Sequence, residues 1–250
     1  MQATVDALRL TANLKACVCN IEMPPDVLLE RQLSRLSGVD LTTIRYRRLE
    51  PVHAERIDQA LHTLDAVADR LCFIRPPYDL RNVADSVDAF GASLIVLDYI
   101  QRIAPPGQHD NHRGSVNATM DYLRQFADAG VAVIVVSAVG RTKDNKGRSS
   151  YSGDGLNLAS FRESSELEFG ADDAFILHPD ERTVGSHLIK LKHLKSRQGE
   201  CRDLLMTFDR PHQSFTPLAS NTTSSNNGTF STELLSLWDN TAAAQEAQSE

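Results

Sequence analysis

One stretch near the middle of the chain constrains its fold more than any other. Residues Ser93–Leu97 are almost entirely apolar and run directly into Asp98, with Phe90-Gly91 before them and Pro105-Pro106 after them. A continuous apolar run bounded by turn residues is typical of a strand that is buried on both faces of a parallel sheet. Ligands of such sheets bind beyond the carboxyl ends of the strands. Asp98 therefore either belongs to a binding site, where it could hold Mg²⁺ beside phosphates, or only caps the following loop.

The composition narrows the class of protein. With 250 residues and 41% apolar content, the chain is large enough for one domain, or for one domain and a tail. The net charge of -7 excludes a basic nucleic-acid coat protein, so any contact with nucleic acid must come from local basic loops. No signal peptide is visible and no apolar run is long enough to span a membrane, so a cytoplasmic location is expected.

The cysteines agree with that location. Cys17 and Cys19 fall on the same face of one predicted strand, which is a poor arrangement for a disulfide between them. No second ligand pair is spaced for metal binding. Reduced thiols in the protein core are therefore expected.

The pattern of apolar residues alternates between strand and helix periods along the chain. Helices are predicted at 1–14, 27–36, 40–48, 50–68, 79–90, 111–129 and 160–169. Strands are predicted at 16–23, 70–74, 93–98, 131–136, 173–177, 187–194 and 203–208, and a polar loop at 140–158. This alternation predicts an α/β fold with a mostly parallel sheet flanked by helices.

The last part of the chain differs in composition. From residue 219 it is rich in Ser, Thr, Asn and Ala, which predicts a disordered polar tail over 218–250. Within it, Phe230–Trp238 has amphipathic helix spacing. This segment is either a peptide that docks on a partner or a marginal helix that lies on the domain.

Two carboxylates are expected at one edge of the predicted sheet. Glu22 ends the strand predicted at 16–23, and Asp98 ends the apolar strand. The carboxyl ends of parallel strands share one edge, so both side chains can face one crevice. One carboxylate can then ligate Mg²⁺ while the other polarises water for attack on a phosphate. The alternative for Glu22 is an ordinary surface residue before Pro24-Pro25.

A basic loop follows the second apolar strand. It carries four basic residues against one acid, namely Arg141, Lys143, Lys146 and Arg148. A flexible basic loop can follow the phosphate backbone of a nucleic acid without reading its bases. The alternative is a plain solvated loop.

A second basic segment lies at the predicted turn between the strands at 187–194 and 203–208. Lys195 and Arg197 alternate onto one side of this turn. A basic pair on a hairpin can reach a phosphate that is bound by a neighbouring subunit. The alternative is a pair of surface charges that aids solubility.

Five separated segments occur in a fixed order along the chain. They are Asn20-Ile21-Glu22-Met23, Asp98-Tyr99-Ile100-Gln101, Val136-Ser137-Ala138-Val139-Gly140-Arg141, Phe161-Arg162-Glu163-Ser164 with Leu167-Glu168 and Ala171-Asp172, and Lys195-Ser196-Arg197-Gln198-Gly199. Together they resemble motifs of the RecA-like motor domain of DnaB-type replicative helicases (superfamily four): Ser-Leu-Glu-Met, the Walker B Asp-Tyr-Leu-Gln, Leu-Ser-Gln-Leu-Ser-Arg, Leu-Arg-Glu-Ser…Ile-Glu…Ala-Asp and Lys-x-Arg-x-Gly. The resemblance spans about residues 1–215.

The resemblance implies a RecA-like fold and a role for each matched residue. Glu22 would be the catalytic base, Asp98 would position Mg²⁺, and Gln101 and Ser137 would line the nucleotide site. Lys195 and Arg197 would act in trans on the nucleotide of a neighbouring subunit. The DNA-binding residues would be Arg113, Arg141, Lys143, Lys146 and Arg148. The implied cofactors are ATP and Mg²⁺, and the implied partners are single-stranded DNA, further copies in a hexameric ring, and a replication loader or primase.

Two departures from the family separate this chain from an ordinary helicase core. No Gly-x-x-x-x-Gly-Lys-[Ser/Thr] sequence occurs in it. In the family this Walker A loop directly precedes the helix predicted at 1–14, so residues 1–217 are expected to be an amino-terminally truncated core without the P-loop strand. Ala138 also replaces the family's Gln that senses the γ-phosphate, and a methyl group cannot hydrogen-bond a phosphate.

These departures leave the activity open. The chain by itself is expected to hydrolyse ATP poorly or not at all. Two other functions remain: a RecA-family recombination or regulatory ATPase, and a catalytically dead DNA-binding subunit of a ring.

Overall fold

The described part of this computed structural model comprises residues 1–107, 112–139, 142–143, 149–150, 157–158, 170–179 and 187–218, and residues 1–218 form one compact unit. For residues 112–113, 142–143 and 149–150 the description is limited to the backbone. The predictions for the helix at 160–169 and for the tail lie outside the described residues. Among the described helices, none is both long and apolar enough to cross a membrane.

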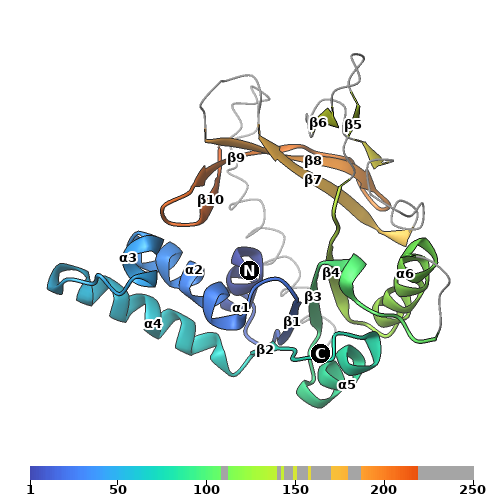
Figure 1. Cartoon of the computed structure of the whole chain (residues 1–250), viewed down its shortest axis with the longest axis horizontal. Helices are drawn as coiled ribbons and strands as arrows, with labels where there is room; N and C mark the ends of the chain where they lie inside the picture. The colour runs from blue at the N-terminus through green and yellow to red at the C-terminus, as the bar shows by residue number, and fades with distance from the viewer. Residues whose placement is uncertain are drawn as a thin grey trace, which may run out of the picture. The chain divides into compact units, whose positions relative to one another are not determined.

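A four-stranded parallel sheet forms the centre of the fold (Figure 1). Its strands are β1 (Ala16–Asn20), β2 (Leu71–Phe73), β3 (Leu94–Asp98) and β4 (Ala132–Val136), in the order β2-β1-β3-β4. Four of the five residues of β3 are buried, which confirms the prediction for the apolar run that ends in Asp98.

Helices cover both faces of this sheet, as the α/β prediction requires. On one face, Leu8 of α1 (Gln2–Leu10) and Val67 of α4 (Ala54–Ala68) pack with Val18 and Val96. On the other face, apolar residues of α5 (Leu80–Phe90) and α6 (His112–Asp128) pack with Cys17 and Ile95. The remaining described helices are α2 (Pro25–Ser37), α3 (Leu41–Arg45) and the short 3₁₀ turns η1 (Pro51–His53) and η2 (Ile100–Arg102).

A second, antiparallel sheet is built from the last part of the unit. Its strands are β7 (Asp173–Pro179), β8 (Leu188–Ser196), β9 (Leu204–Asp209) and β10 (Ser214–Pro217), in the order β10-β9-β8-β7. Sequence patterns predicted the first three and missed β10, which is short and ends in proline. The region predicted as a polar loop also contains a small antiparallel pair, β5 (Thr142–Lys143) with β6 (Ser149–Ser150).

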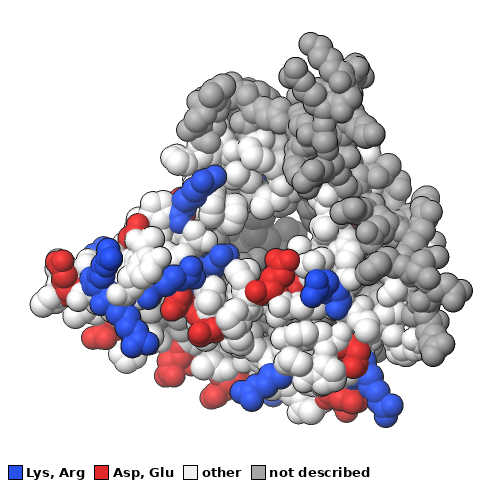
Figure 2. Space-filling model, in the orientation of Figure 1, with Lys and Arg blue, Asp and Glu red and all other residues white. Residues whose placement is uncertain are grey.

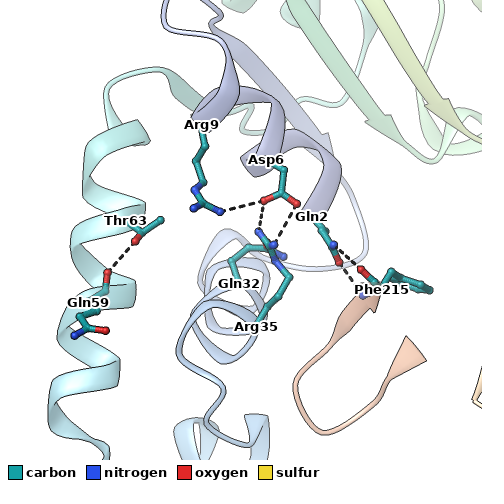
Figure 3. Close-up of polar contacts among 8 residues, drawn as sticks. All are labelled: Gln2, Asp6, Arg9, Gln32, Arg35, Gln59, Thr63 and Phe215. Atoms are coloured by element: carbon teal, nitrogen blue, oxygen red, sulfur yellow. Dashed lines mark hydrogen bonds and ion pairs between the residues drawn. The ribbon is translucent and has the colours of Figure 1, made fainter. Parts of the chain in front are cut away.

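The first helix is tied to the last strand (Figure 3). The side chain of Gln2 donates to the carbonyl of Phe215 and accepts from its N–H, both at 2.9 Å. On the same helix, Asp6 accepts two bonds from the guanidinium of Arg35 on α2, at 2.9 and 3.2 Å. The amino-terminal helix is therefore held by polar contacts from two separate elements.

Two predicted boundaries are wrong for identifiable reasons. The strand predicted at 16–23 ends at Asn20, because the chain then turns over the Asn20 side chain. The helix predicted at 1–14 ends at Leu10. There the guanidinium of Arg70 caps the helix, donating to the carbonyls of Leu8, Thr11 and Leu14 at 2.7, 2.8 and 3.4 Å.

The second apolar strand is also placed differently from the first. β4 lies at the edge of the parallel sheet as described, and Ala132, Ile134 and Val136 are exposed. Its sequence is as apolar as that of β3, yet alternate side chains of β4 are exposed, whereas β3 is packed against helices on both faces. Four cysteines, Cys17, Cys19, Cys72 and Cys201, are unbridged, and the first two are buried in the core as predicted.

Candidate active site

The carboxyl ends of β1 and β3 meet through one asparagine. Asn20 and Asp98 are opposite each other in the register of the two strands. The amide nitrogen of Asn20 donates to Oδ2 of Asp98 at 2.6 Å. Its oxygen accepts from the backbone N–H groups of Glu22 and Met23 at 3.1 and 2.8 Å. One side chain therefore holds the aspartate in place and shapes the turn that carries Glu22.

The two carboxylates of this site interact electrostatically. Burial raises the pKa of Asp98 above its ordinary value, and the nearby charge of Glu22 raises it further. The amino group of Met1 and the hydrogen bond from Asn20 act in the opposite direction. Asp98 and Glu22 are thus brought into one region, as the sequence predicts, although Glu22 lies in a turn beyond the strand.

The start of α1 adds a positive end to this region. The amino group of Met1 is close enough to Asp98 for their charges to interact, while burial lowers the pKa of that amino group. The first N–H groups of a helix carry a partial positive charge and favour anions. Carboxylates and a helix start therefore lie at the same edge of the sheet.

This donor set fits a magnesium ion that is shared with a phosphate. Mg²⁺ in such sites takes one or two carboxylates and completes its shell with water and phosphate oxygens. A bound cation favours the ionised form of Asp98 and so opposes both the burial and the repulsion by Glu22 that raise its pKa. No cluster of three or more His, Cys, Asp or Glu side chains occurs in the described ranges, so a cage made wholly of protein ligands is not found there.

Gln101 and Ser137 come together beside this site. The amide nitrogen of Gln101, in η2, donates to Oγ of Ser137 at 2.9 Å, and its oxygen accepts from the N–H of Ala138 at 3.3 Å. These residues follow the neighbouring parallel strands β3 and β4, which brings them together at the carboxyl edge of the sheet. The methyl group of Ala138 adds no hydrogen-bonding group there.

Lys195 and Arg197 lie in the antiparallel sheet and its turn. Arg197 donates through its guanidinium to Oδ1 of Asp172 at 2.8 Å and through its backbone N–H to the Asp172 carbonyl at 2.9 Å. Arg124 of α6 binds the same carboxylate at 2.9 Å and, with Arg197, holds the pKa of Asp172 below its ordinary value. In the part of the chain that the structure describes, Arg197 is thus tied to Asp172, whereas Asp98 is tied to Asn20.

Two residues of these clusters were not assigned a role from the sequence. Asn20 is the first residue of the segment Asn20-Ile21-Glu22-Met23. The strand register places it directly opposite Asp98, which indicates its role. Arg124 gave no such signal, because its partner Asp172 is distant in sequence and joins it through tertiary packing.

The predicted DNA-binding residues remain untested. Arg141, Lys146 and Arg148 lie outside the described residues, and the side chains of Arg113 (α6) and Lys143 (β5) are not described. On the face in Figure 2, basic and acidic side chains are interspersed over α2, α3 and α4, which does not resemble a basic nucleic-acid footprint.

Comparison with known proteins points to one family. The family described as "DnaB-like helicase C terminal domain" matches residues 2–217. The replicative DNA helicase DnaB of Pasteurella multocida (strain Pm70) is 28% identical over 186 residues, which cover 69% of this chain and 37% of that protein. The DnaB of Haemophilus influenzae is 27% identical over 173 residues, covering 66% and 36% respectively. This chain therefore spans little more than a third of the curated relatives that it matches.

Solved structures agree at the level of the fold. A structure described as an "ATPase Domain" superposes with a TM-score of 0.71 at 16% identity, covering 83% of this chain and 75% of that one. "The Structure Of A DnaB-Like Replicative Helicase And Its Interactions With Primase" gives the same TM-score and identity, covering 83% and 51%. Identities this low show a shared fold and carry no residue roles by themselves.

Proposed function

Because this chain belongs to the DnaB-like helicase C-terminal domain family, we propose that it is the ATPase core of a ring-forming helicase subunit. In this proposal ATP hydrolysis drives movement along single-stranded DNA during replication in the cytoplasm. The observation that carries it is the contact between Asn20, Asp98 and the turn of Glu22 at the shared edge of β1 and β3. Asn20 binds the Asp98 carboxylate, which can hold a metal ion, and the backbone of Glu22, whose carboxylate can act on water.

Each residue of the site has a role in this chemistry. Glu22 takes the proton of the water that attacks the terminal phosphate. Asp98 would hold Mg²⁺, which would neutralise charge on the phosphates. Asn20 keeps Asp98 oriented, and the Gln101–Ser137 pair lines the nucleotide site next to it. The start of α1 favours the negative charge of the nucleotide.

Other residues act between subunits and on DNA. Lys195 and Arg197 reach the nucleotide of the neighbouring subunit in a hexameric ring, where a guanidinium stabilises charge in the transition state. Arg197 must then exchange its contact with Asp172 for the phosphate. The DNA contacts come from Arg113 and from the basic residues of the loop that follows β4, namely Arg141, Lys143, Lys146 and Arg148. A loader or a primase is a further partner.

The chain on its own should have little of this activity. Its sequence contains no Gly-x-x-x-x-Gly-Lys-[Ser/Thr] phosphate loop, and Ala138 offers no side-chain hydrogen bond to the γ-phosphate. The same features favour the second candidate, a nucleotide-independent subunit that joins a ring and binds DNA.

One experiment addresses both candidates. The purified chain is mixed with ATP, Mg²⁺ and dye-labelled single-stranded DNA, and phosphate release and fluorescence anisotropy are followed in the same samples. We expect phosphate release at background, unchanged by Asp98→Ala. We also expect DNA binding that weakens steeply with salt and is lost when Arg141, Lys143, Lys146 and Arg148 are replaced by alanine.

Two outcomes would contradict these expectations. Strong ATP turnover that Asp98→Ala abolishes would contradict the expected inactivity of the isolated chain. DNA binding that is insensitive to the four substitutions would contradict the assigned DNA interface. Replacement of Arg75, Arg81, Arg202 and Arg210 by alanine removes equal charge from exposed positions elsewhere and is the matched control.

A further inference from the structure

His193, near the end of β8, binds both to β7 and to the turn 197–203 that leads into β9. Its ring nitrogen Nε2 lies 3.1 Å from Oδ1 of Asp173 on β7. The other ring nitrogen, Nδ1, accepts from the backbone N–H of Arg202 at 3.1 Å. The backbone N–H of His193 donates to Oδ1 of Asp203 at 3.0 Å. One residue therefore joins the start of β7 to the end of this turn.

The ring of His193 is packed in a fixed orientation. Its side chain is only 10% exposed. It stacks on the ring of Phe175, with the two centroids 4.3 Å apart, and the strand register places these residues directly opposite each other on β7 and β8. A ring that is held by a neighbouring ring and by two polar partners keeps one nitrogen toward each partner. Nδ1 therefore faces Arg202, and Nε2 faces Asp173.

These two contacts determine which ring nitrogen carries the proton in the neutral form. An amide N–H can only donate, so Nδ1 must accept and must carry no proton. The single proton of the neutral imidazole is then on Nε2, where it points to the carboxylate of Asp173. The protonated ring has an N–H group at both positions. Its new N–H at Nδ1 would meet the N–H of Arg202, so this hydrogen bond is lost when the ring becomes charged.

The charged groups near the ring separate its protonation from other titrations. They are Asp173 on β7, Lys190, Lys192 and Lys195 on β8, and Glu200, Arg202 and Asp203 in the turn. When the ring is charged, its contact with Asp173 becomes an ion pair. The hydrogen bond from Lys190 and the nearby charge of Lys192 hold the pKa of Asp203 below its ordinary value of 3.8. Asp203 is therefore ionised throughout the range from about pH 5 to 8, in which histidine ordinarily changes its charge.

We propose that His193 is a positioning residue that closes the turn 197–203 in its neutral form and releases the β9 side of this turn when it is protonated. The charged ring stays on Asp173, because both groups of that contact then carry opposite charges. The backbone of Arg202 moves away, because Nδ1 no longer accepts its N–H. The charge on one imidazole therefore decides whether the turn is held at one side or at both.

Opening of the turn affects the two basic residues that are assigned to act between subunits. Lys195 lies at the end of β8, and Arg197 begins the turn. The backbone N–H of Arg197 donates to the Asp172 carbonyl and holds the β8 side of the turn, while neutral His193 holds the other side through Arg202. A protonated ring removes the second hold, so Arg197 is presented in a less defined position. This role deepens the proposed function and rests on it only for what Lys195 and Arg197 do.

Nitrogen NMR of the histidine rings tests the position of the proton and needs neither ATP nor DNA. In the purified, isotope-labelled chain at neutral pH, His193 should carry its proton on Nε2. A scalar coupling should connect Nδ1 to the amide nitrogen of Arg202 across their hydrogen bond. As the pH falls, the ring nitrogens report the charged fraction of the ring directly. The coupling should disappear in proportion to that fraction.

Amide hydrogen exchange measures the opening of the turn in the same samples. Protonation of the ring should lower the protection of the Arg202 amide about fivefold relative to neutral pH, which is the effect of losing one hydrogen bond. The amide of Arg197 is the internal control, because its hydrogen bond to the Asp172 carbonyl does not involve the ring. Its protection should change by less than about twofold.

Two substitutions of His193 separate the two ring contacts. His193→Asn places a carbonyl oxygen near the position of Nδ1 and cannot be protonated, so the Arg202 amide should stay protected at every pH at which the protein is folded. His193→Gln places its polar atoms near the position of Nε2, within reach of Asp173 but not of Arg202. Protection of Arg202 should then be about fivefold lower at every pH. If either variant does not fold, as judged by circular dichroism, the measurements on the wild-type chain still decide the proposal.

Three results would overturn the proposal. The first is a neutral ring of His193 that carries its proton on Nδ1. The second is protection of the Arg202 amide that does not change while the ring becomes charged. The third is equal protection of Arg202 in His193→Asn and His193→Gln. A failure of the proposed ATPase core or of its DNA binding would leave all of these measurements unaffected, so the two proposals fail separately.

Discussion

The two four-stranded sheets of this protein are stabilised in different ways. In the parallel sheet, β3 has helices on both faces, and Ile95 and Leu97 are fully buried. In the antiparallel sheet, every residue of β8 is only partly buried. β7 buries Ala174 and Ile176 on one face, and ion pairs join Lys190 to Asp203 at 2.6 Å and, just after β8, Arg197 to Asp172 at 2.8 Å.

This difference explains how the molecule can combine a rigid site with adjustable contacts. Apolar burial fixes the ends of β1 and β3, so Asp98 and Asn20 meet in one arrangement. Exposed ion pairs contribute little to stability and can exchange partners. Arg197 is therefore placed where it can leave Asp172 for another anion at small energetic cost, which the proposed action between subunits requires.

The largest expected effect on the free energy of unfolding comes from a Leu→Ala substitution, which can be made in each of the two sheets. Leu97→Ala in β3 should lower the free energy of unfolding by about 2–5 kcal/mol, because it leaves a cavity in a fully buried site. Leu177→Ala in β7, where the side chain is 52% exposed, should change it by less than about 0.5 kcal/mol. Urea denaturation of both variants measures the difference. Equal losses would show that the two sheets are equally packed.

A polar substitution sharpens the same comparison. Asn20→Ala should lower the free energy of unfolding by about 1–2 kcal/mol, because it removes the donor to a partly buried carboxylate and the acceptor of two backbone N–H groups. Thr207→Val in β9, which removes a single long hydrogen bond at 3.4 Å, should cost less than about 0.5 kcal/mol. Chemical denaturation at neutral pH measures both variants. A larger loss of stability for Thr207→Val than for Asn20→Ala would contradict this prediction.

The smallest expected effect is a pH dependence in the antiparallel sheet. The hydrogen bond from Lys190 lowers the pKa of Asp203 below its ordinary value of 3.8. A lowered pKa means that this carboxylate stabilises the fold above pH 3.8, and that the contribution is lost as the pH falls through the folded-state pKa. Asp203→Asn should therefore lower the free energy of unfolding by less than about 1 kcal/mol at neutral pH and leave it unchanged in strong acid.

Unfolding of wild type and Asp203→Asn across this pH range, at low and high salt, measures the effect. Added salt should shrink the difference at neutral pH, since both partners reach solvent. A difference that is constant with pH would mean that the substitution acts through packing and not through charge.

Particular residues show which features of the fold could be predicted from the sequence. The burial of β3 and the core position of Cys17 and Cys19 both followed from residue patterns and strand order. The end of β1 did not, because a side chain two positions before Glu22 turns the backbone. β10 was missed because its short polar sequence becomes a strand through pairing with β9.

The sequence by itself determined the α/β class, the strand that ends in Asp98 and the membership of the DnaB-like helicase family. Those features depend on residue order and on apolar periodicity, which are local. The tertiary structure decided that Asn20 ties Asp98 to the turn of Glu22, that Asp172 holds Arg197, and that alternate residues of β4 are exposed although it is as apolar as β3. Each of these depends on which distant segments become neighbours, and periodicity along a chain carries no record of that.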